Sequence, residues 1–192
     1  MQSTDFNTTL ALVTTTGRRA PSPVLPRALE PLFSRLAVCH DDTEATAVED
    51  RIWDLWMYHP HRRAARDLDR AATEIAAQCH DIAETRLARL LRAAPDYAEA
   101  WNKRATLYYL QERDDECLRN LHRVLELEPR HFGALCAVAE ILLAHEDREG
   151  ALLAFETALR IHPHLDEARQ RVSELRSPAA DTLGTVEASN EP

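Results

Sequence analysis

The sequence predicts an all-α fold, built as a solenoid of antiparallel helix pairs. Two observations support this prediction. Five of the ten prolines recur at nearly constant spacing, and the segments between them carry apolar residues with the 3.6-residue period of an α-helix. No segment shows the apolar–polar alternation that is typical of a β-strand.

The recurring prolines mark boundaries between helices. They are separated by 34, 35, 34 and 34 residues, and they are Pro26, Pro60, Pro95, Pro129 and Pro163. Proline has no N–H for a helix interior and disfavours helical backbone in the residue before it. We therefore expect one helix to end and the next to begin near each of these prolines.

Each unit between prolines has two blocks of apolar residues at helical spacing. After Pro95 these are Ala98, Trp101, Ala105 and Tyr108, then Cys117, Leu121, Val124 and Leu127. Asp96 and Glu99 form a D-x-x-E pattern, which predicts a capping box at the start of the first of these helices. One helix pair cannot cover its own apolar face, so we expect the core to form between stacked pairs.

These residues resemble the tetratricopeptide repeat, whose 34-residue unit carries W-x2-L-G-x2-Y, then A-x3-F, then P. The unit after Pro95 departs from this pattern at Arg104, where leucine is usual. The resemblance implies a right-handed superhelical solenoid of about three to four repeats closed by a polar C-terminal helix. Residues 95–109 also resemble small bacterial tetratricopeptide proteins. The positions assigned to the repeat signature are Ala83, Leu87, Pro95, Trp101, Ala105, Tyr108, Cys117, Leu121, Pro129, Ala139, Ala151, Phe155, Ala158 and Pro163.

The predicted organisation has four parts. A disordered tail over 1–26 precedes a divergent helical pair over 27–62; the repeat array with its capping helix follows over 63–176, and a second disordered tail covers 177–192. The alternative for the first tail is an organellar transit peptide, because the segment from Phe6 to Leu29 has three arginines and no acid. We otherwise expect a cytoplasmic protein, since no apolar run is long enough for a membrane span.

Composition excludes several functional classes. The 192-residue chain has 23 basic and 32 acidic residues, a net charge of −9, which argues against nucleic acid or an anionic membrane as partner. Its 4 glycines are too dispersed for a phosphate loop or a dinucleotide fingerprint. No cofactor is therefore expected.

The cysteines and histidines form no recognisable metal motif. None of the 4 cysteines stands in a C-x-x-C pair. His59-Pro60-His61 and His162-Pro163-His164 repeat one tripeptide, but a solenoid keeps them apart and each supplies only two ligands. Catalytic spacings such as H-E-x-x-H are also absent, and the acidic clusters fall at expected helix starts. We predict a protein that is not an enzyme.

The family resemblance implies a concave groove lined by the first helix of each pair. Amide side chains there can hold a peptide backbone, and a tyrosine offers a flat apolar surface with a polar tip. A lysine clamp for the acidic tails of heat-shock chaperones is not expected, because Glu140 would repel a carboxylate. The residues expected to face a partner are Asn102, Lys103, Thr106, Tyr109, Cys136, Glu140, Leu143 and Gln170, with Gly133 beside them.

Two tryptophans in the divergent N-terminal pair allow two interpretations. Trp53 and Trp56 share one helix face with Ile52. They either plug the N-terminal end of the array or form an exposed contact patch. Trp101, in the repeat signature, is expected to fill a packed site, so that Trp101→Ala would cost about 3–5 kcal/mol.

The leading functional hypothesis is an adaptor that binds a peptide or helix of a protein partner in the groove. Three alternatives remain open from the sequence. They are a chaperone for a secreted or assembly-prone partner, a structural subunit docked through its N-terminal helices, and a metal-binding or enzymatic protein that uses the adjacent pairs Cys39-His40 and Cys79-His80, each of which offers two ligands.

Overall fold

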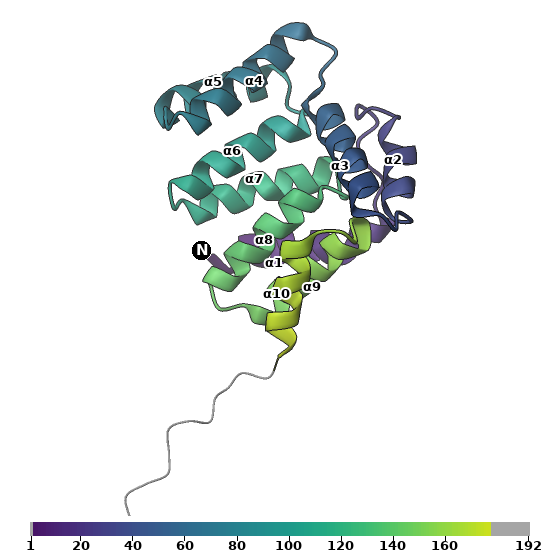
Figure 1. Ribbon diagram of the computed structural model, residues 1–192. Helices are drawn as coiled ribbons and strands as arrows, with labels where there is room; N and C mark the ends of the chain where they lie inside the picture. The colour runs from purple at the N-terminus through teal and green to yellow at the C-terminus, as the bar shows by residue number, and fades with distance from the viewer. Residues whose placement is uncertain (1, 178–192) are drawn as a thin grey trace, which may run out of the picture.

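The computed structural model describes residues 2–177. Within this range all regular structure is helical, as the sequence predicted (Figure 1). The predicted tail over 177–192 lies outside the described residues except for Ser177. The helices are α1 Gln2–Thr15, the 3-10 turn η1 Thr16–Arg18, α2 Leu29–Leu36, α3 Asp42–Met57, α4 Arg62–Ala76, α5 His80–Ala93, α6 Ala98–Leu110, α7 Asp114–Leu127, α8 Phe132–Ala144, α9 Arg148–Ile161 and α10 Asp166–Arg176.

Three antiparallel helix pairs form the repeat array. They are α4 with α5, α6 with α7, and α8 with α9, and α10 packs on α9 as a closing helix. The second helix of each pair carries one small residue at the same place in the repeat, and these are Ala83, Cys117 and Ala151. They are at most 1% exposed, and their small size lets the packed helices approach closely. Leu87, Leu121 and Phe155 are equally buried.

The turn inside each pair repeats in atomic detail. Gln78, Glu112 and Glu146 lie 34 residues apart, and they are the non-glycine residues with positive φ, at 57°, 57° and 63°, in the part of the chain described. The N–H of the next residue in each case donates to the carbonyl five residues before it, that of Glu74, Tyr108 or Leu142, at 2.8–2.9 Å. This is a Schellman-type helix end in which a side-chain-bearing residue occupies the position that glycine prefers.

The turn between pairs repeats as well. The N–H groups of Ala94, Glu128 and His162, each directly before a signature proline, bond to the carbonyl four residues earlier at 2.8 Å. Proline then ends the helix, because it has no N–H to continue the ladder. The predicted 34-residue period is therefore present in backbone hydrogen bonds as well as in side chains.

The start of α6 differs from the predicted capping box. Its N-cap is Tyr97, with no side-chain capping hydrogen bond, and the Glu99 side chain is fully buried. Other helix starts follow the usual chemistry: Asp147 accepts a hydrogen bond from the Gly150 N–H at the start of α9. The difference at α6 arises because Glu99 bonds across the groove edge instead of to its own helix end.

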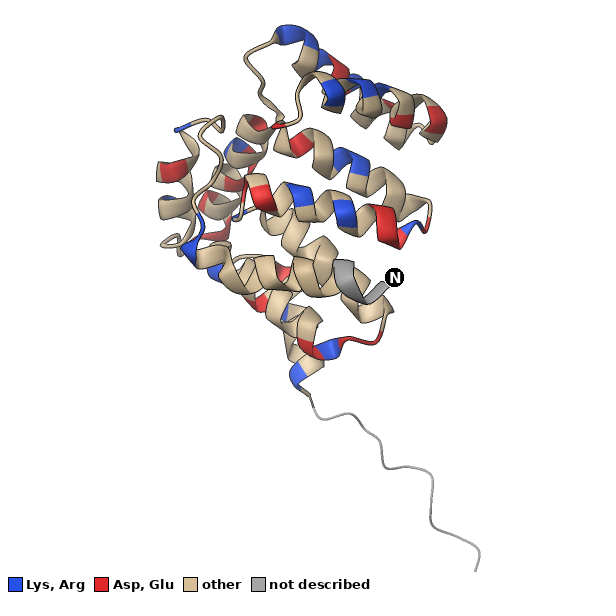
Figure 2. Ribbon diagram, turned by 180° about the vertical axis from the view of Figure 1, so that it is seen from behind, with Lys and Arg blue, Asp and Glu red and all other residues tan. Residues whose placement is uncertain are grey.

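The expectation of a disordered tail over 1–26 is wrong for most of that segment. α1 packs against α7 and α9, and in the view from behind it lies across these second helices (Figure 2). Val13 is fully buried, the Phe6 ring lies 4.9 Å from that of His145, and Thr9 Oγ1 lies 3.2 Å from His122 Nδ1. The helical spacing of Phe6, Leu10 and Val13 was the available signal, hidden by a threonine-rich composition.

The proline-rich stretch after α1 is anchored to the end of α7. The Arg19 guanidinium donates to the carbonyl oxygens of Leu125 and Glu126 at 3.0 and 3.2 Å, and the Ser22 N–H donates to the Leu127 oxygen at 2.7 Å. A cation at the C-terminal end of a helix satisfies carbonyls that have no partner within the helix. Arg19 thus stabilises α7, which gives one arginine of this segment a structural role.

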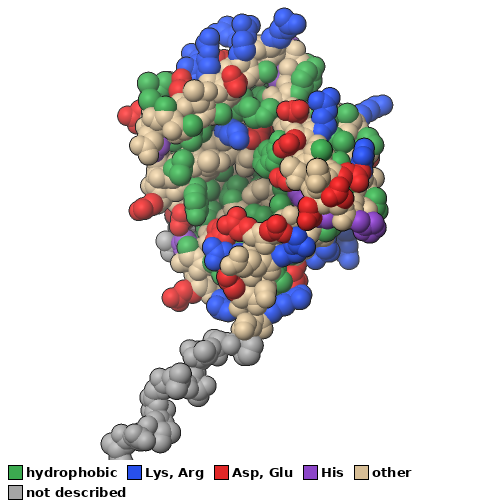
Figure 3. Space-filling view, in the orientation of Figure 1, with side chains coloured by type: hydrophobic (Ala, Val, Ile, Leu, Met, Phe, Trp, Pro, Cys, Tyr) green, Lys and Arg blue, Asp and Glu red, His purple; other side chains and the backbone are tan. Residues whose placement is uncertain are grey.

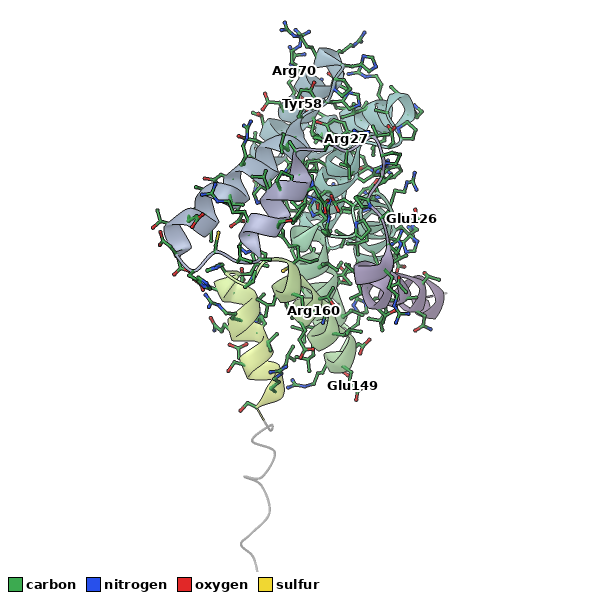
Figure 4. All side chains as sticks on the ribbon, turned by 90° about the vertical axis from the view of Figure 1, so that its right-hand side faces the viewer. Arg27, Tyr58, Arg70, Glu126, Glu149 and Arg160 are labelled. Atoms are coloured by element: carbon green, nitrogen blue, oxygen red, sulfur yellow. The ribbon has the colours of Figure 1, made fainter. Side chains whose placement is uncertain are left out.

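α2 and α3 lie along the edge formed by the turns between pairs. Arg130 joins α2 to this edge, because its guanidinium lies 2.7 Å from Glu30 and 4.2 Å from the Phe33 ring centroid. Helices therefore occupy the segment predicted as a divergent pair. They do not stack as a further repeat at the end of the array; α3 instead crosses its side (Figure 4).

Candidate functional site

A groove of about 720 Å³ lies between α6, α8 and α10. In the space-filling view it has a hydrophobic floor, with acidic side chains along one margin (Figure 3). Its apolar lining includes Ala105, Leu121, Phe132, Ala137, Phe155 and Ala168. The polar and charged lining includes Glu49, Asn102, Lys103, Thr106, Tyr109, Cys136, Glu140, His164, Asp166, Glu167 and Arg171.

α3 forms one wall of this groove. It runs across the N-terminal ends of α10, α8 and α6, which it contacts in that order from its start to its end. Asp42 at its start lies 2.7 Å from His164, just before α10, and Glu49 lies 3.0 Å from His162. Near its end, the Met57 carbonyl accepts a hydrogen bond from the Tyr97 hydroxyl, just before α6.

The middle of α3 contacts the start of α8 through its two tryptophans. Trp56 is 2% exposed and stacks on the His131 ring, with centroids 4.0 Å apart and planes 7° from parallel. Trp53 is half-buried and meets the rings of Trp56, His131 and Phe132 at 5.0–5.5 Å, edge to face in each case. The tryptophans are therefore packed within the protein, but against the third pair and not at the N-terminal end of the array.

A buried carboxylate sits behind this wall. Glu99 is 1% exposed and lies 3.0 Å from His131 Nε2, 3.0 Å from Lys103 Nζ and 3.2 Å from Asn102 Nδ2. His131 Nδ1 accepts the Ala134 N–H, so the Nε2–H donates to Glu99. Burial raises the pKa of Glu99, but the hydrogen bond from His131 and the charge of Lys103 outweigh it and hold that pKa below its ordinary value.

Six of the eight residues predicted to face a partner line the groove. Thr106 and Tyr109 are exposed on it, and Cys136 is partly buried in its wall. Asn102 and Lys103 are tied to Glu99. Glu140 lies 3.1 Å from Arg171 of α10.

The other two predicted residues lie elsewhere. Leu143 packs against the core, and Gln170 donates to Glu174 at 2.8 Å on the exposed side of α10. α10 instead presents Glu167 and Arg171, which follow Gly133 and Ala137 by the 34-residue period. That period was the signal for both residues. No periodic signal pointed to Glu49, Trp53 or His164, because they come from outside the repeating positions.

Trp101 differs from its predicted environment. It is half-buried, its Nε1–H donates to the Pro95 carbonyl at 2.9 Å, and the Arg104 guanidinium lies 4.6 Å from its ring centroid. The signature tryptophan therefore lies against the surface, covered by the arginine that replaces the usual leucine. Removal of this half-buried ring is therefore expected to cost less than the predicted value of about 3–5 kcal/mol, which applies to a fully packed tryptophan.

The two His-Pro-His segments lie in different surroundings. The rings of His59 and His61 are 5.5 Å apart beside Tyr97, whereas His162 and His164 contact the wall helix α3. Among the side chains that the structure describes, no three of His, Cys, Asp or Glu gather as a metal site would require. The described helices likewise include none that is long and apolar enough to cross a membrane.

Comparisons with known proteins identify the fold. The chain matches no family model. It is 31% identical over 152 residues to a TPR repeat-containing protein of Rhizobium etli, a match that covers 79% of this chain and 74% of that protein. The solved structure of a point mutant of MamA is similar in fold, with a TM-score of 0.50, 17% identity, and coverage of 76% of this chain and 82% of that one.

Sequence similarity over this share of both chains, together with the helix pairs and their 34-residue turns, determines the family. Proteins of this fold are generally interaction modules without catalytic activity. The chain belongs to the tetratricopeptide repeat family.

Proposed function

We infer that the chain binds a segment of a protein partner in the groove between α6, α8 and α10. The observation that carries this proposal is an open groove of about 720 Å³, which has an apolar floor and a side wall formed by α3. A hollow of this size takes several side chains of an extended segment or one face of a short helix. The apolar floor supplies the favourable free energy when these side chains leave water.

Residues on the open side of the groove are the best candidates for contact. Tyr109 is 49% exposed, and Thr106 and Cys136 lie beside it along the lining. Tyrosine is enriched at binding hot spots because it offers a large rigid surface with a hydrogen-bonding tip. Asn102 is a weaker candidate for gripping a peptide backbone, since its amide already donates to Glu99.

The chemistry of the groove favours binding over reaction. Burial, with the Glu167 and Glu140 carboxylates nearby, raises the pKa of the Cys136 thiol to about 12. A thiol with so high a pKa is not a thiolate nucleophile near neutral pH. Cys136 is therefore expected to act as a small half-buried surface in the groove.

A docking role for the tryptophan-rich helix has lost its main support. Exposed Trp53 and Trp56 would have favoured that alternative, whereas Trp56 is 2% exposed and Trp53 packs on α8. No contact in the described residues favours the chaperone role over a general adaptor. The proposal therefore remains a groove-binding adaptor.

Two matched tryptophan substitutions test the proposal. Thr106 and Thr85 are both exposed and helical, but only Thr106 lines the groove, while Thr85 lies on α5. We expect Thr106→Trp to fill the groove and to remove the proteins that co-purify with the wild type, while Thr85→Trp retains them. A partner retained by folded Thr106→Trp would contradict binding in the groove.

A further inference from the structure

The charges around the groove are strongly unequal, and this inequality restricts the partner. Four carboxylates line it, against the cations Lys103 and Arg171 and one histidine. The carboxylates are Glu49, Glu140, Asp166 and Glu167, and they come from α3, α8 and α10. The net charge of the lining is thus negative.

Both cations are already neutralised by the protein itself. Lys103 Nζ lies 3.0 Å from the buried Glu99, and Arg171 lies 3.1 Å from Glu140 and 3.5 Å from Glu174. The lining histidine, His164, has its pKa raised by hydrogen bonds to Asp42 and the Cys39 carbonyl, and any charge it carries is balanced by Asp42 at 2.7 Å. A partner's carboxylate would therefore find each of these three cationic groups of the groove already paired with a carboxylate of the protein itself.

One carboxylate of the lining has no partner of its own. Glu167, in the first turn of α10, is exposed and makes no hydrogen bond or ion pair with the described residues. Glu140, on α8, also lines the groove, and both carboxylates lie near enough to the Cys136 thiol to raise its pKa. Two carboxylates thus border the apolar floor near Cys136, Glu140 from α8, which is paired with Arg171, and Glu167 from α10, which is unpaired among the described residues.

We propose that the groove recognises a cationic segment, in which a Lys or Arg side chain seats between Glu140 and Glu167 and adjacent apolar side chains cover the floor. This proposal rests on the function proposed above and specifies its partner class. Charge complementarity fixes which segments bind fastest and excludes acidic ones. The chain's own last residues are a poor occupant, because 178–192 carry Asp181, Glu187 and Glu191 and no basic residue.

Selection from a random peptide library displayed on phage tests this directly. Peptides are selected on the full-length wild type and sorted by binding to Thr85→Trp and to Thr106→Trp. Peptides that bind the first variant and not the second depend on the groove. We expect these to carry net positive charge, with Lys or Arg next to apolar residues.

The outcomes separate the two proposals. Groove-dependent peptides that are neutral or acidic would overturn the cationic partner and leave groove binding intact. A selection without any groove-dependent peptide would overturn both. An acidic stretch resembling 178–192 among the enriched peptides would point to the chain's own tail as the occupant and equally overturn the proposal.

A matched pair of double variants then measures how much the groove carboxylates contribute to peptide affinity. Glu140→Gln/Glu167→Gln removes one paired and one unpaired carboxylate from the groove. Glu126→Gln/Glu149→Gln makes the same charge change away from it: Glu126 pairs with Arg123 at 2.8 Å, and both glutamates lie on the other side from α10 (Figure 4). For the best cationic peptide we expect at least a tenfold loss of affinity in the first variant and less than a twofold loss in the second. Equal losses would overturn the assignment.

Discussion

The indole of Trp53 lies directly over Gly133, so that a Cβ at Gly133 would come within 3.0 Å of the Trp53 Cη2 atom. This contact joins the wall helix α3 to the first turn of α8. Trp53 has little room to move away, because it is surrounded by the rings of Trp56, His131 and Phe132 and its Nε1–H donates to Glu49 at 3.1 Å. The absence of a side chain at Gly133 thus lets α3 pack against α8 and form one wall of the groove.

Gly133→Ala should therefore destabilise the protein by about 1 kcal/mol, although alanine is the better helix former by about the same amount. In a Trp53→Ala background the same change should stabilise, because the steric conflict is gone. Urea unfolding of the four proteins in this double-mutant cycle measures the coupling. Equal effects of Gly133→Ala in the two backgrounds would contradict the contact.

Glu99→Gln should cost about 2 kcal/mol of unfolding free energy, because a buried charged acceptor is lost from Lys103, His131 and Asn102. Glu149→Gln, at an exposed position in the first turn of α9, is the control and should change stability by less than about 0.5 kcal/mol. Chemical denaturation monitored by circular dichroism measures the unfolding free energy of both variants and of the wild type. Similar values for the two variants would mean that the buried network contributes nothing.

The same carboxylate predicts how stability depends on pH. The pKa of Glu99 is lower in the folded chain than its ordinary value of 4.5, and the hydrogen bond from His162 lowers the pKa of Glu49 in the same direction. A lowered folded pKa gives stability that is present above about pH 4.5 and is lost as the pH falls toward the folded pKa values. Unfolding free energies measured from about pH 6 to about pH 3 should fall steeply in the wild type and less steeply in Glu99→Gln. Parallel profiles would exclude Glu99 as a source of the dependence.

Trp56 and Trp101 should respond very differently to truncation. Trp56→Ala removes a ring that is 2% exposed and stacked on His131, and it should cost about 3–5 kcal/mol. Trp101→Ala removes a half-buried ring and should cost less than half as much. The Trp56 Nε1–H is buried without an acceptor among the described residues, so Trp56→Phe should retain most of the stability. Thermal unfolding of the three variants gives the order, and a larger loss for Trp101→Ala would reverse our assignment.

Glu112→Gly should stabilise the chain by about 1 kcal/mol, because a residue with a Cβ is strained at a φ of 57° and glycine is not. Glu149→Gly, in the first turn of α9, should instead destabilise by up to about 1 kcal/mol, because glycine loses more backbone freedom on folding and is a poorer helix former than glutamate. Comparing the two melting temperatures separates the local conformational effect from the loss of a glutamate. A lower melting temperature for Glu112→Gly would show that the turn does not have this backbone.

The sequence was sufficient to predict the features that recur with the 34-residue period. The prolines fixed the ends of α5, α7 and α9, and the apolar period placed Leu87, Leu121 and Phe155 in the core. The same period placed Thr106 and Cys136 on the groove. Local backbone chemistry and stacking of like units determine all of these features, and both leave a regular trace in the sequence.

Contacts made by the N-terminal helices were not predictable in this way. Asp42 and His164 are 122 residues apart, and Glu49 and His162 are 113 apart, so no spacing rule links them. Glu99 illustrates the same limit within the array. Its position suggested a helix cap, but a histidine 32 residues later supplies a stronger partner, because buried charge-assisted hydrogen bonds outweigh a solvated cap.

If partners bind in the groove walled by α3, the amide groups around this groove should change their chemical shifts when a ligand is added, and NMR measures these changes residue by residue. The 21.8 kDa chain, labelled with ¹⁵N, is titrated with the most enriched groove-dependent peptide or with a segment of a co-purified partner. We predict shifts that cluster at Thr106, Tyr109, Cys136 and Glu167, with α1 unaffected. Shifts confined to α1 and the second helices α7 and α9 would contradict the account and place binding on the opposite face.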